Sequence, residues 1–179
     1  MLIVITGGSG SGKSVYAEQL LTKLTDTEKY YIATMQPFGE ETKKRIARHQ
    51  KQRQGNNFIT VEQYVKIETA DIPIGASVLL ECMSNLVANE MFNETNTRQS
   101  NEIYDDIISG IEQLCKRCKH LVIVTNEVFS DGNCYDKETR KYIACLGLIN
   151  QRLAQLADSM VEVVYSIPVC IKGAFQWTL

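Results

Sequence analysis

Eight residues near the start of the chain have the types and spacing of a phosphate-binding loop. Gly7, Gly12, Lys13 and Ser14 fit the pattern G-x-x-x-x-G-K-[ST], between an apolar run and a segment with helical periodicity. Glycines adopt backbone angles that other residues avoid, so successive N–H groups can point at phosphate oxygens. Lys13 would contact the β- and γ-phosphates, Ser14 would bind Mg²⁺, and the start of the next helix would add its positive dipole end. We therefore expect a nucleoside triphosphate on Gly7, Gly8, Ser9, Gly10, Ser11, Gly12, Lys13 and Ser14; a glycine-rich turn without a ligand is the alternative.

A basic segment, residues 40–55, brings a histidine between two arginines. Arg45, His49 and Arg53 are spaced i, i+4, i+8, so a helix would project them from one face. Ile46 is the only large apolar residue of the segment, which therefore resembles an exposed lid more than a scaffold. The surrounding positive charge favours the neutral imidazole, whose free ring nitrogen can attack phosphorus. The alternative is a solvent-exposed histidine with no role in catalysis.

Polar side chains also follow two of the predicted strands. Glu81 ends one apolar run, and Asn126 and Glu127 follow another. Open parallel sheets bind ligands at the carboxyl ends of their strands, where a carboxylate can hold Mg²⁺ through water or accept a hydroxyl proton. The alternative is that Glu81 lies at the start of a helix and that its carboxylate oxygens accept hydrogen bonds from backbone N–H groups there.

The elements that must position these residues alternate along the chain. Short apolar, β-branched runs predict buried strands, and stripes with a 3.6-residue period predict helices between them. Such alternation is typical of a parallel sheet with right-handed crossovers and helices on both faces. The last stretch, "VEVVYSIPVCIKG", predicts two antiparallel strands joined at Ser166–Pro168. We expect an α/β fold, a P-loop NTPase-like mostly parallel sheet with an antiparallel C-terminal edge, with strands at 2–6, 30–34, 77–81, 121–125 and 161–165 and helices at 14–24, 103–114 and 143–156.

Composition bounds the function class. The 179 residues, 44% hydrophobic, predict a single nucleotide-binding transferase domain over residues 1–179. A net charge of −2 argues against nucleic acid as a partner, and the sequence contains no run long enough for a membrane span. The chain opens on "MLIVIT" without a leader pattern, which predicts a cytoplasmic protein with reduced cysteines. Cys115 and Cys118 have a C-x-x-C spacing, but no second pair follows to complete a zinc site.

Six blocks in this chain together resemble a known family. They read "TGGSGSGKS", "YIATMQ", "KRIARHQKQR", "VLLECMSNLVAN", "VIVTNEV" and "INQRLAQLAD", and they cover nearly the whole sequence. In this order they are similar to the bifunctional adenosylcobinamide kinase and adenosylcobinamide-phosphate guanylyltransferase of cobalamin biosynthesis. The resemblance implies that ATP or GTP phosphorylates adenosylcobinamide, a corrinoid. GTP then guanylylates a histidine, and the GMP passes to the substrate phosphate to give adenosylcobinamide-GDP.

The same resemblance assigns roles by position. His49 matches the guanylylated histidine, the loop residues bind the triphosphate with Mg²⁺, and sites lie at the boundaries of a homotrimer. Three other interpretations stay open: a P-loop small-molecule kinase in which His49 has no role, a non-enzymatic binding module controlled by nucleotide, and a guanylyltransferase without kinase activity. Further nucleotide contacts are expected at Ala33, Thr34, Met35, Gln50, Lys51, Gln52, Arg53, Glu62 and Glu81.

Overall fold

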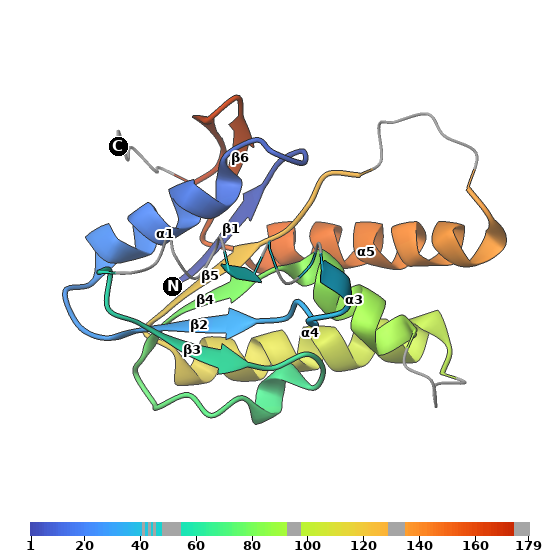
Figure 1. The fold of residues 1–179 in the computed structure, drawn as a ribbon, viewed down its shortest axis with the longest axis horizontal. Helices are drawn as coiled ribbons and strands as arrows, with labels where there is room; N and C mark the ends of the chain where they lie inside the picture. Colours follow the sequence, from blue (N-terminus) through green and yellow to red (C-terminus); the bar gives the residue numbers. More distant parts are fainter. Residues whose placement is uncertain are drawn as a thin grey trace.

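Seven strands form one sheet, in the order β3-β2-β4-β5-β1-β6-β7 (Figure 1). The first six are parallel to one another, and β7 pairs antiparallel with β6. The computed structural model describes residues 1–40, 42, 44, 46–47, 55–92, 98–128 and 135–173. The strands are β1 (Leu2–Thr6), β2 (Lys29–Ala33), β3 (Phe58–Glu62), β4 (Ser77–Glu81), β5 (His120–Val124), β6 (Ser159–Val164) and β7 (Ile167–Lys172). The helices are α1 (Lys13–Leu24), the 3₁₀ turn η1 (Ile67–Thr69), α3 (Met83–Met91), α4 (Ser100–Arg117) and α5 (Lys137–Leu156).

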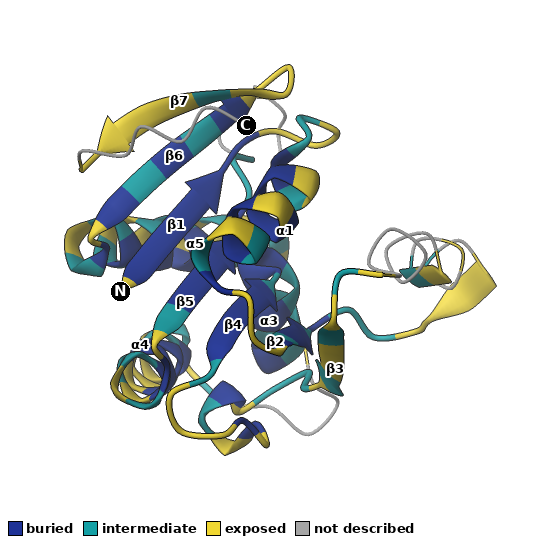
Figure 2. Ribbon diagram, turned by 90° about the vertical axis from the view of Figure 1, so that its left-hand side faces the viewer, coloured by how far each residue is buried: buried dark blue, intermediate teal, exposed yellow. Residues whose placement is uncertain are grey.

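The central strands are apolar on both faces because helices cover both sides of the sheet. All five residues of β1 are buried. Its alternate side chains enter two cores: Ile3 and Ile5 pack with α1, whereas Leu2 and Val4 belong to the core that contains α3, α4 and α5. Figure 1 shows α1 on one face and the other three helices on the opposite face. Figure 2 shows the burial falling from β1, β4 and β5 toward the edge strands.

The five predicted strands are confirmed, with boundaries that differ by at most two residues. β3 is an additional strand that the sequence did not predict. It lies at a sheet edge, and each of its residues is exposed or half-buried. Its sequence, FITVE, therefore lacks the continuous apolar character by which the buried strands were recognised.

The antiparallel edge is confirmed, but the predicted turn at Ser166–Pro168 is wrong. The turn residues are Tyr165 and Ser166, with φ of 49° and 64°, and Pro168 is already part of β7, opposite Val163. Proline is tolerated in a sheet at an edge strand, which is where β7 lies. Left-handed backbone at two successive residues is the conformation of tight hairpin turns, so the connection is shorter than expected.

The predicted helices are confirmed and extend further than their apolar stripes. α5 begins at Lys137 rather than near Ile143, because Asp136 accepts the N–H groups of Glu138 and Thr139, each at 2.9 Å. In the predicted segment 40–55, residues 40, 42, 44, 46 and 47 are helical, and residues 41, 43, 45 and 48–54 lie outside the described residues.

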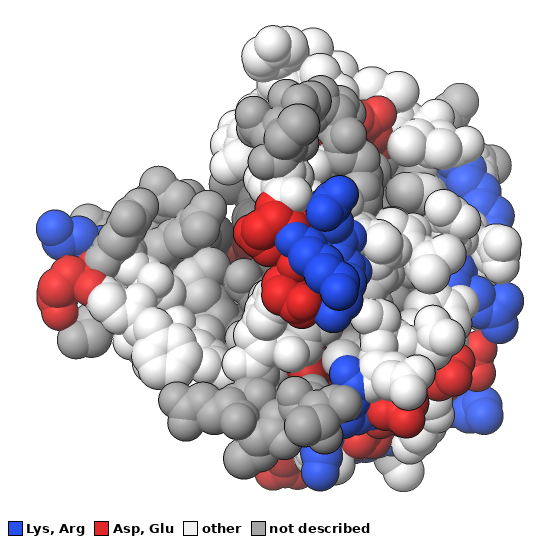
Figure 3. All heavy atoms as spheres, turned by 90° about the vertical axis from the view of Figure 1, so that its right-hand side faces the viewer, with Lys and Arg blue, Asp and Glu red and all other residues white. Residues whose placement is uncertain are grey.

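Charge is mixed over the surface. On the face drawn in Figure 3, basic and acidic side chains lie side by side rather than in regions of one sign. Within the described part of the chain, no helix has the length and apolar character that crossing a membrane requires. The five cysteines described are free thiols. Cys118 and Cys82 are buried, and Cys115 is half-buried.

Candidate functional site

The phosphate-binding loop connects β1 to α1, and two of its glycines are required by their surroundings. Gly12 precedes α1 with a φ of 90°, and a Cβ at this position would lie 2.6 Å from Ser166 Oγ. A Cβ on Gly7 would lie 2.5 Å from the carbonyl oxygen of Val163. Both contacts come from the β6–β7 hairpin, whose Ser166 N–H also donates a hydrogen bond to the Ser11 carbonyl oxygen at 2.8 Å. The hairpin therefore packs directly against the loop and helps to fix its backbone.

Three side chains of the loop carry hydrogen-bond donors. Lys13 is 8% exposed, and its Nζ donates to the Gly8 carbonyl oxygen at 2.9 Å, across the loop. Ser11 Oγ is buried and has no hydrogen-bond partner among the described residues. Because a buried hydroxyl without a partner is costly, it fits an acceptor such as a phosphate oxygen. Ser14 Oγ donates to Glu81 Oε1. The sequence-predicted loop is thus a preformed group of donors.

Glu81 links the loop to the neighbouring strands. Its two carboxylate oxygens accept hydrogen bonds from side chains: Oε1 from Ser14, and Oε2 from the hydroxyl of buried Tyr31 at 3.0 Å. The alternative in which backbone N–H groups at a helix start satisfy Glu81 is therefore wrong. Hydroxyl and carboxylate oxygens are the ligands that Mg²⁺ prefers, so Ser14 and Glu81 fit this ion. The described residues contain no group of three or more His, Cys, Asp or Glu side chains for a metal, so phosphate and water would complete its coordination.

Two adjoining cavities meet at Glu81. The larger, of about 430 Å³, extends from the phosphate-binding loop to the residues that follow β5. The smaller, of about 100 Å³, lies between the ends of β2 and β3. Met35, Glu81, Cys82 and Asn85 line both. The remaining lining residues are Ser9, Gly10, Ser11, Gly12, Lys13, Ser14, Val15, Val124, Asn126, Glu127 and Val128 in the larger cavity. In the smaller cavity they are Tyr31, Ala33, Pro37, Ile46, Thr60, Glu62 and Tyr64.

The smaller cavity combines apolar walls with two hydrogen-bonded pairs, Tyr31–Glu81 and Tyr64–Glu62. Tyr64 donates its hydroxyl proton to Glu62 Oε2 at 2.8 Å. Burial, together with the hydrogen bond to Glu62 and the negative charge of that side chain, raises the pKa of Tyr64 to about 12. The Tyr64–Glu62 pair therefore keeps its proton at neutral pH. A flat group with hydrogen-bond donors at its edge, such as a purine base, suits walls of this kind.

Most of the other predicted contact residues line one of the two cavities, but one of them does not. Asn126 and Glu127 line the larger cavity as expected from their position after β5. Of the predicted residues 33–35, Ala33 and Met35 line cavities, but Thr34 is fully buried and its hydroxyl contacts Cys82, donating to its carbonyl oxygen at 2.9 Å and accepting its N–H at 2.8 Å. Glu62 and Glu81 line the smaller cavity.

The basic segment is described only in part. Arg45, His49, Gln50, Lys51, Gln52 and Arg53 lie outside the described residues. Ile46, three residues before His49, lines the smaller cavity, so this part of the segment lies at the candidate site.

Sequence reasoning missed several residues of the site. Tyr31 was assigned only to a strand, although its hydroxyl contacts Glu81. Tyr64 follows β3, Ser166 lies in the turn between β6 and β7, and Asn85 lies within α3; none of the three was assigned to the site from the sequence. Only the unpredicted strand β3 explains how Tyr64 comes near Glu81. The sequence offered no signal for Tyr64, because β3, the strand before it, is half-polar and was not recognised as a strand.

Comparison with known proteins gives a consistent result. The model of the family described as cobinamide kinase / cobinamide phosphate guanyltransferase matches residues 3–171. The "bifunctional adenosylcobalamin biosynthesis protein CobU" of Salmonella typhimurium is 34% identical, covering 96% of this chain and 100% of the relative. The protein of the same name from Escherichia coli gives the same figures. The "bifunctional adenosylcobalamin biosynthesis protein CobP" of Pseudomonas aeruginosa is 25% identical over 95% of this chain and 96% of its own.

Solved structures that superpose on the chain are more distant. The flagellar accessory protein FlaH from Methanocaldococcus jannaschii gives a TM-score of 0.48 at 13% identity, covering 98% of this chain and 81% of that chain. An ATPase domain gives a TM-score of 0.48 at 11% identity, covering 90% and 68%. The match over residues 3–171 and the two relatives at 34% identity decide the assignment. This chain belongs to the cobinamide kinase / cobinamide phosphate guanyltransferase family.

Proposed function

We propose that this protein phosphorylates adenosylcobinamide and then transfers GMP from GTP to adenosylcobinamide phosphate, in cobalamin biosynthesis, through a guanylylated His49. Family membership supports the two activities. The observation that most supports one site for both is the position of Glu81, which lies between a cavity lined by the phosphate-binding loop and a smaller cavity of suitable character for a base.

In this proposal the loop binds and orients the triphosphate. Backbone N–H groups of residues 8–14, the Lys13 ammonium group and the Ser11 hydroxyl contact phosphate oxygens. Ser14 and Glu81 would hold Mg²⁺, which when bound neutralises phosphate charge. Phosphoryl transfer depends mainly on positioning and charge neutralisation, and a set of donors fixed before binding supplies both.

The guanylyl transfer divides into two displacements at the α-phosphorus. An imidazole nitrogen of His49 attacks this phosphorus, the bond to the β-phosphate oxygen breaks, and pyrophosphate leaves. A phosphate oxygen of adenosylcobinamide phosphate then attacks the same phosphorus and displaces the imidazole, which regains its original state. Support comes from Ile46, three residues before His49, which lines the smaller cavity. Gln50, Lys51, Gln52 and Arg53 would contact the nucleotide from the same segment.

The base would occupy the smaller cavity. Ala33 and Met35 offer apolar walls, and Glu62 is an acceptor whose second contact, with Tyr64, fixes its orientation. A guanine presents two adjacent N–H donors at its edge, whereas an adenine does not, so a carboxylate in this place favours GTP. In the kinase step the adenosylcobinamide hydroxyl would attack the γ-phosphorus, the bond to the β-phosphate oxygen would break, and the nucleoside diphosphate would leave. A carboxylate that lines the larger cavity, Glu81 or Glu127, can accept the hydroxyl proton.

Three further features belong to the proposal. We expect one domain over residues 1–179, a homotrimer with sites at the subunit boundaries, and a cytoplasmic reaction, where GTP and ATP are supplied. Size-exclusion chromatography with light scattering measures the oligomeric state directly.

The covalent step has a direct test. Incubation with Mg²⁺ and GTP labelled at the α-phosphate should leave label on the protein that is stable to base and labile to acid, as for a phosphoramidate. His49→Ala should abolish this label, and His120→Asn, at the start of β5 away from both cavities, serves as the matched control. Full guanylyl transfer by His49→Ala would refute the histidine intermediate and favour a kinase without one. Mass spectrometry of adenosylcobinamide with ATP tests the kinase activity separately.

A further inference from the structure

The smaller cavity is bounded by two strand ends that need to be held together. β2 and β3 are parallel neighbours, and their last residues, Ala33 and Glu62, are paired. The backbone leaves the sheet after each of these strands, toward Met35 and Tyr64, and both residues line the cavity. Beyond the paired residues the strand ladder continues with a single bond, from the Gln63 N–H to the Ala33 carbonyl oxygen at 3.1 Å. The width of the cavity therefore depends on contacts from elsewhere.

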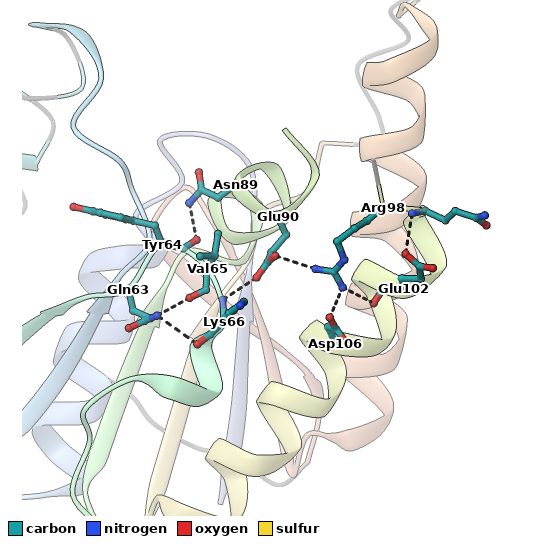
Figure 4. A network of polar contacts seen from close by, with 10 residues as sticks. Gln63, Tyr64, Val65, Lys66, Asn89, Glu90, Arg98, Glu102 and Asp106 are labelled. Carbon is teal, nitrogen blue, oxygen red and sulfur yellow. Dashed lines mark hydrogen bonds and ion pairs between the residues drawn. The ribbon is translucent and has the colours of Figure 1, made fainter. Parts of the chain in front are cut away.

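One side chain of α3 supplies such a contact to both strands. Asn89 Nδ2 donates to the Thr34 carbonyl oxygen at 2.8 Å and to the Tyr64 carbonyl oxygen at 2.9 Å. Both N–H bonds of the amide are used, so the two carbonyl groups are joined through one nitrogen. Figure 4 shows Asn89 directed at Tyr64 from the helix above it. Asn89 itself lines neither cavity.

The neighbouring residue fixes the end of α3 against the same segment. Glu90 Oε1 accepts the Lys66 N–H at 2.8 Å, and its Oε2 lies 3.5 Å from Arg98 Nη1. Arg98 also pairs with Asp106 of α4 (Figure 4). Gln63 Nε2 donates to the Val65 carbonyl oxygen at 2.6 Å, closing the turn after β3. The residues that follow β3 are thus held by polar contacts to α3, which Arg98 in turn links to α4.

We propose that Asn89 is a positioning residue for nucleobase selection: by joining the carbonyl groups of Thr34 and Tyr64, it sets the gap between β2 and β3 and with it the place of the Glu62 carboxylate. The inference rests on the proposed function, because it requires a base in the smaller cavity. Asn89 acts through the backbone of Tyr64, whose hydroxyl holds Glu62 at 2.8 Å. Its loss should change which base is bound and leave the phosphate-binding loop intact.

The test compares three ligands that use the two cavities differently. Tripolyphosphate needs only the phosphate-binding loop, GTP adds the preferred base, and ATP adds the other purine. Asn89→Asp replaces the donor by an acceptor that faces two carbonyl oxygens, and Asn89→Ala removes it while improving helix propensity. Asn101→Asp, at an exposed position of α4, is the matched control. Affinities are measured by isothermal titration calorimetry with Mg²⁺, and folding is checked by urea unfolding.

Both Asn89 variants should lose at least tenfold of the preference for GTP over tripolyphosphate and over ATP, about the effect of one net hydrogen bond or more. Their tripolyphosphate affinity should stay within twofold of the unmodified protein, as should every affinity of Asn101→Asp. Equal losses for all three ligands would show that Asn89 serves the fold alone, and an unchanged preference for GTP in both variants would also overturn the inference. If the unmodified protein binds GTP no more tightly than tripolyphosphate, base recognition in the smaller cavity fails and the inference falls with it.

Discussion

Replacing Gly12 by alanine should weaken triphosphate binding, although the substitution removes no group that contacts phosphate. Gly12 has a φ of 90°, and left-handed backbone costs an L-residue about 1–2 kcal/mol. The new Cβ would also lie 2.6 Å from Ser166 Oγ and 3.3 Å from Ser166 Cβ, so the hairpin or the loop must shift. The loop relieves both costs by leaving the conformation in which its N–H groups point at phosphate. A loss of about 5- to 30-fold in affinity corresponds to the backbone cost alone.

Ser166→Gly separates the two costs. It removes the side chain that the new Cβ would meet but leaves the positive φ of residue 12 unchanged. In the Gly12→Ala background it should therefore restore part of the affinity, with a coupling energy of about 0.5 kcal/mol or more between the two sites. Ser166 itself has a φ of 64°, so the single Ser166→Gly variant should bind triphosphate as well as the unmodified protein does.

Gly75→Ala is the matched control for the backbone cost. Gly75 has a φ of 82°, and a Cβ there would meet no heavy atom within 4 Å. It lies before β4, at the opposite end of that strand from Glu81. Gly75→Ala should lower the free energy of unfolding in urea by about 1–2 kcal/mol and leave the ATP affinity unchanged. Calorimetric titration with Mg²⁺ and ATP measures the affinities. An unchanged affinity in Gly12→Ala, or no recovery on adding Ser166→Gly, would refute the reasoning.

Two further predictions concern the carboxylates of the site. Tyr31→Phe removes one of the two hydrogen bonds to Glu81, so it should raise the Mg²⁺ concentration needed for half-maximal activity and lower the free energy of unfolding in urea by about 1 kcal/mol. Activity assays at varied Mg²⁺ concentration measure the first effect, and an unchanged Mg²⁺ requirement would contradict the role given to Glu81. The pKa of Tyr64 is about 12 in the folded protein and 10 as a free side chain, so the stability that Tyr64 contributes is present below pH 10 and lost as the pH rises toward 12. Glu62→Gln should lower the pKa of Tyr64, measured by titrating the tyrosinate absorbance, but not to 10, because burial also raises it. An unchanged pKa would refute the contact between Glu62 and Tyr64.

The sequence was most informative where a pattern has one physical meaning. The G-x-x-x-x-G-K-[ST] spacing predicted the loop. Short runs such as residues 2–5 predicted strands, because strands that are covered on both faces are apolar at successive positions. Glu81 was recognised as a strand-end acid, but not its contacts. Whether its oxygens meet Ser14, Tyr31 or a helix depends on strand order, and the order β2-β4-β5-β1 cannot be derived from periodicity.

The missed features depend on pairings that are distant in the sequence. β3 pairs with β2 across more than twenty intervening residues, and its half-polar sequence gives no strand signal of its own. Nothing in the sequence distinguishes Asn89 from an ordinary residue of a helix. The role proposed for it follows from the carbonyl oxygens of Thr34 and Tyr64, which the fold brings within 2.9 Å of Asn89 Nδ2. Ser166 contacts Gly12 because the last hairpin folds back onto the first loop.

That last contact has a consequence for the order of events during biosynthesis. Residues 7–14 leave the ribosome well before Val163 and Ser166, which pack against Gly7 and Gly12 and are translated about 150 residues later. A nascent chain thus carries the complete sequence motif long before its backbone is held in shape. Nucleotide bound only by the native loop cannot stabilise the growing polypeptide; its stabilising effect by mass action begins once the β6–β7 hairpin has emerged and docked.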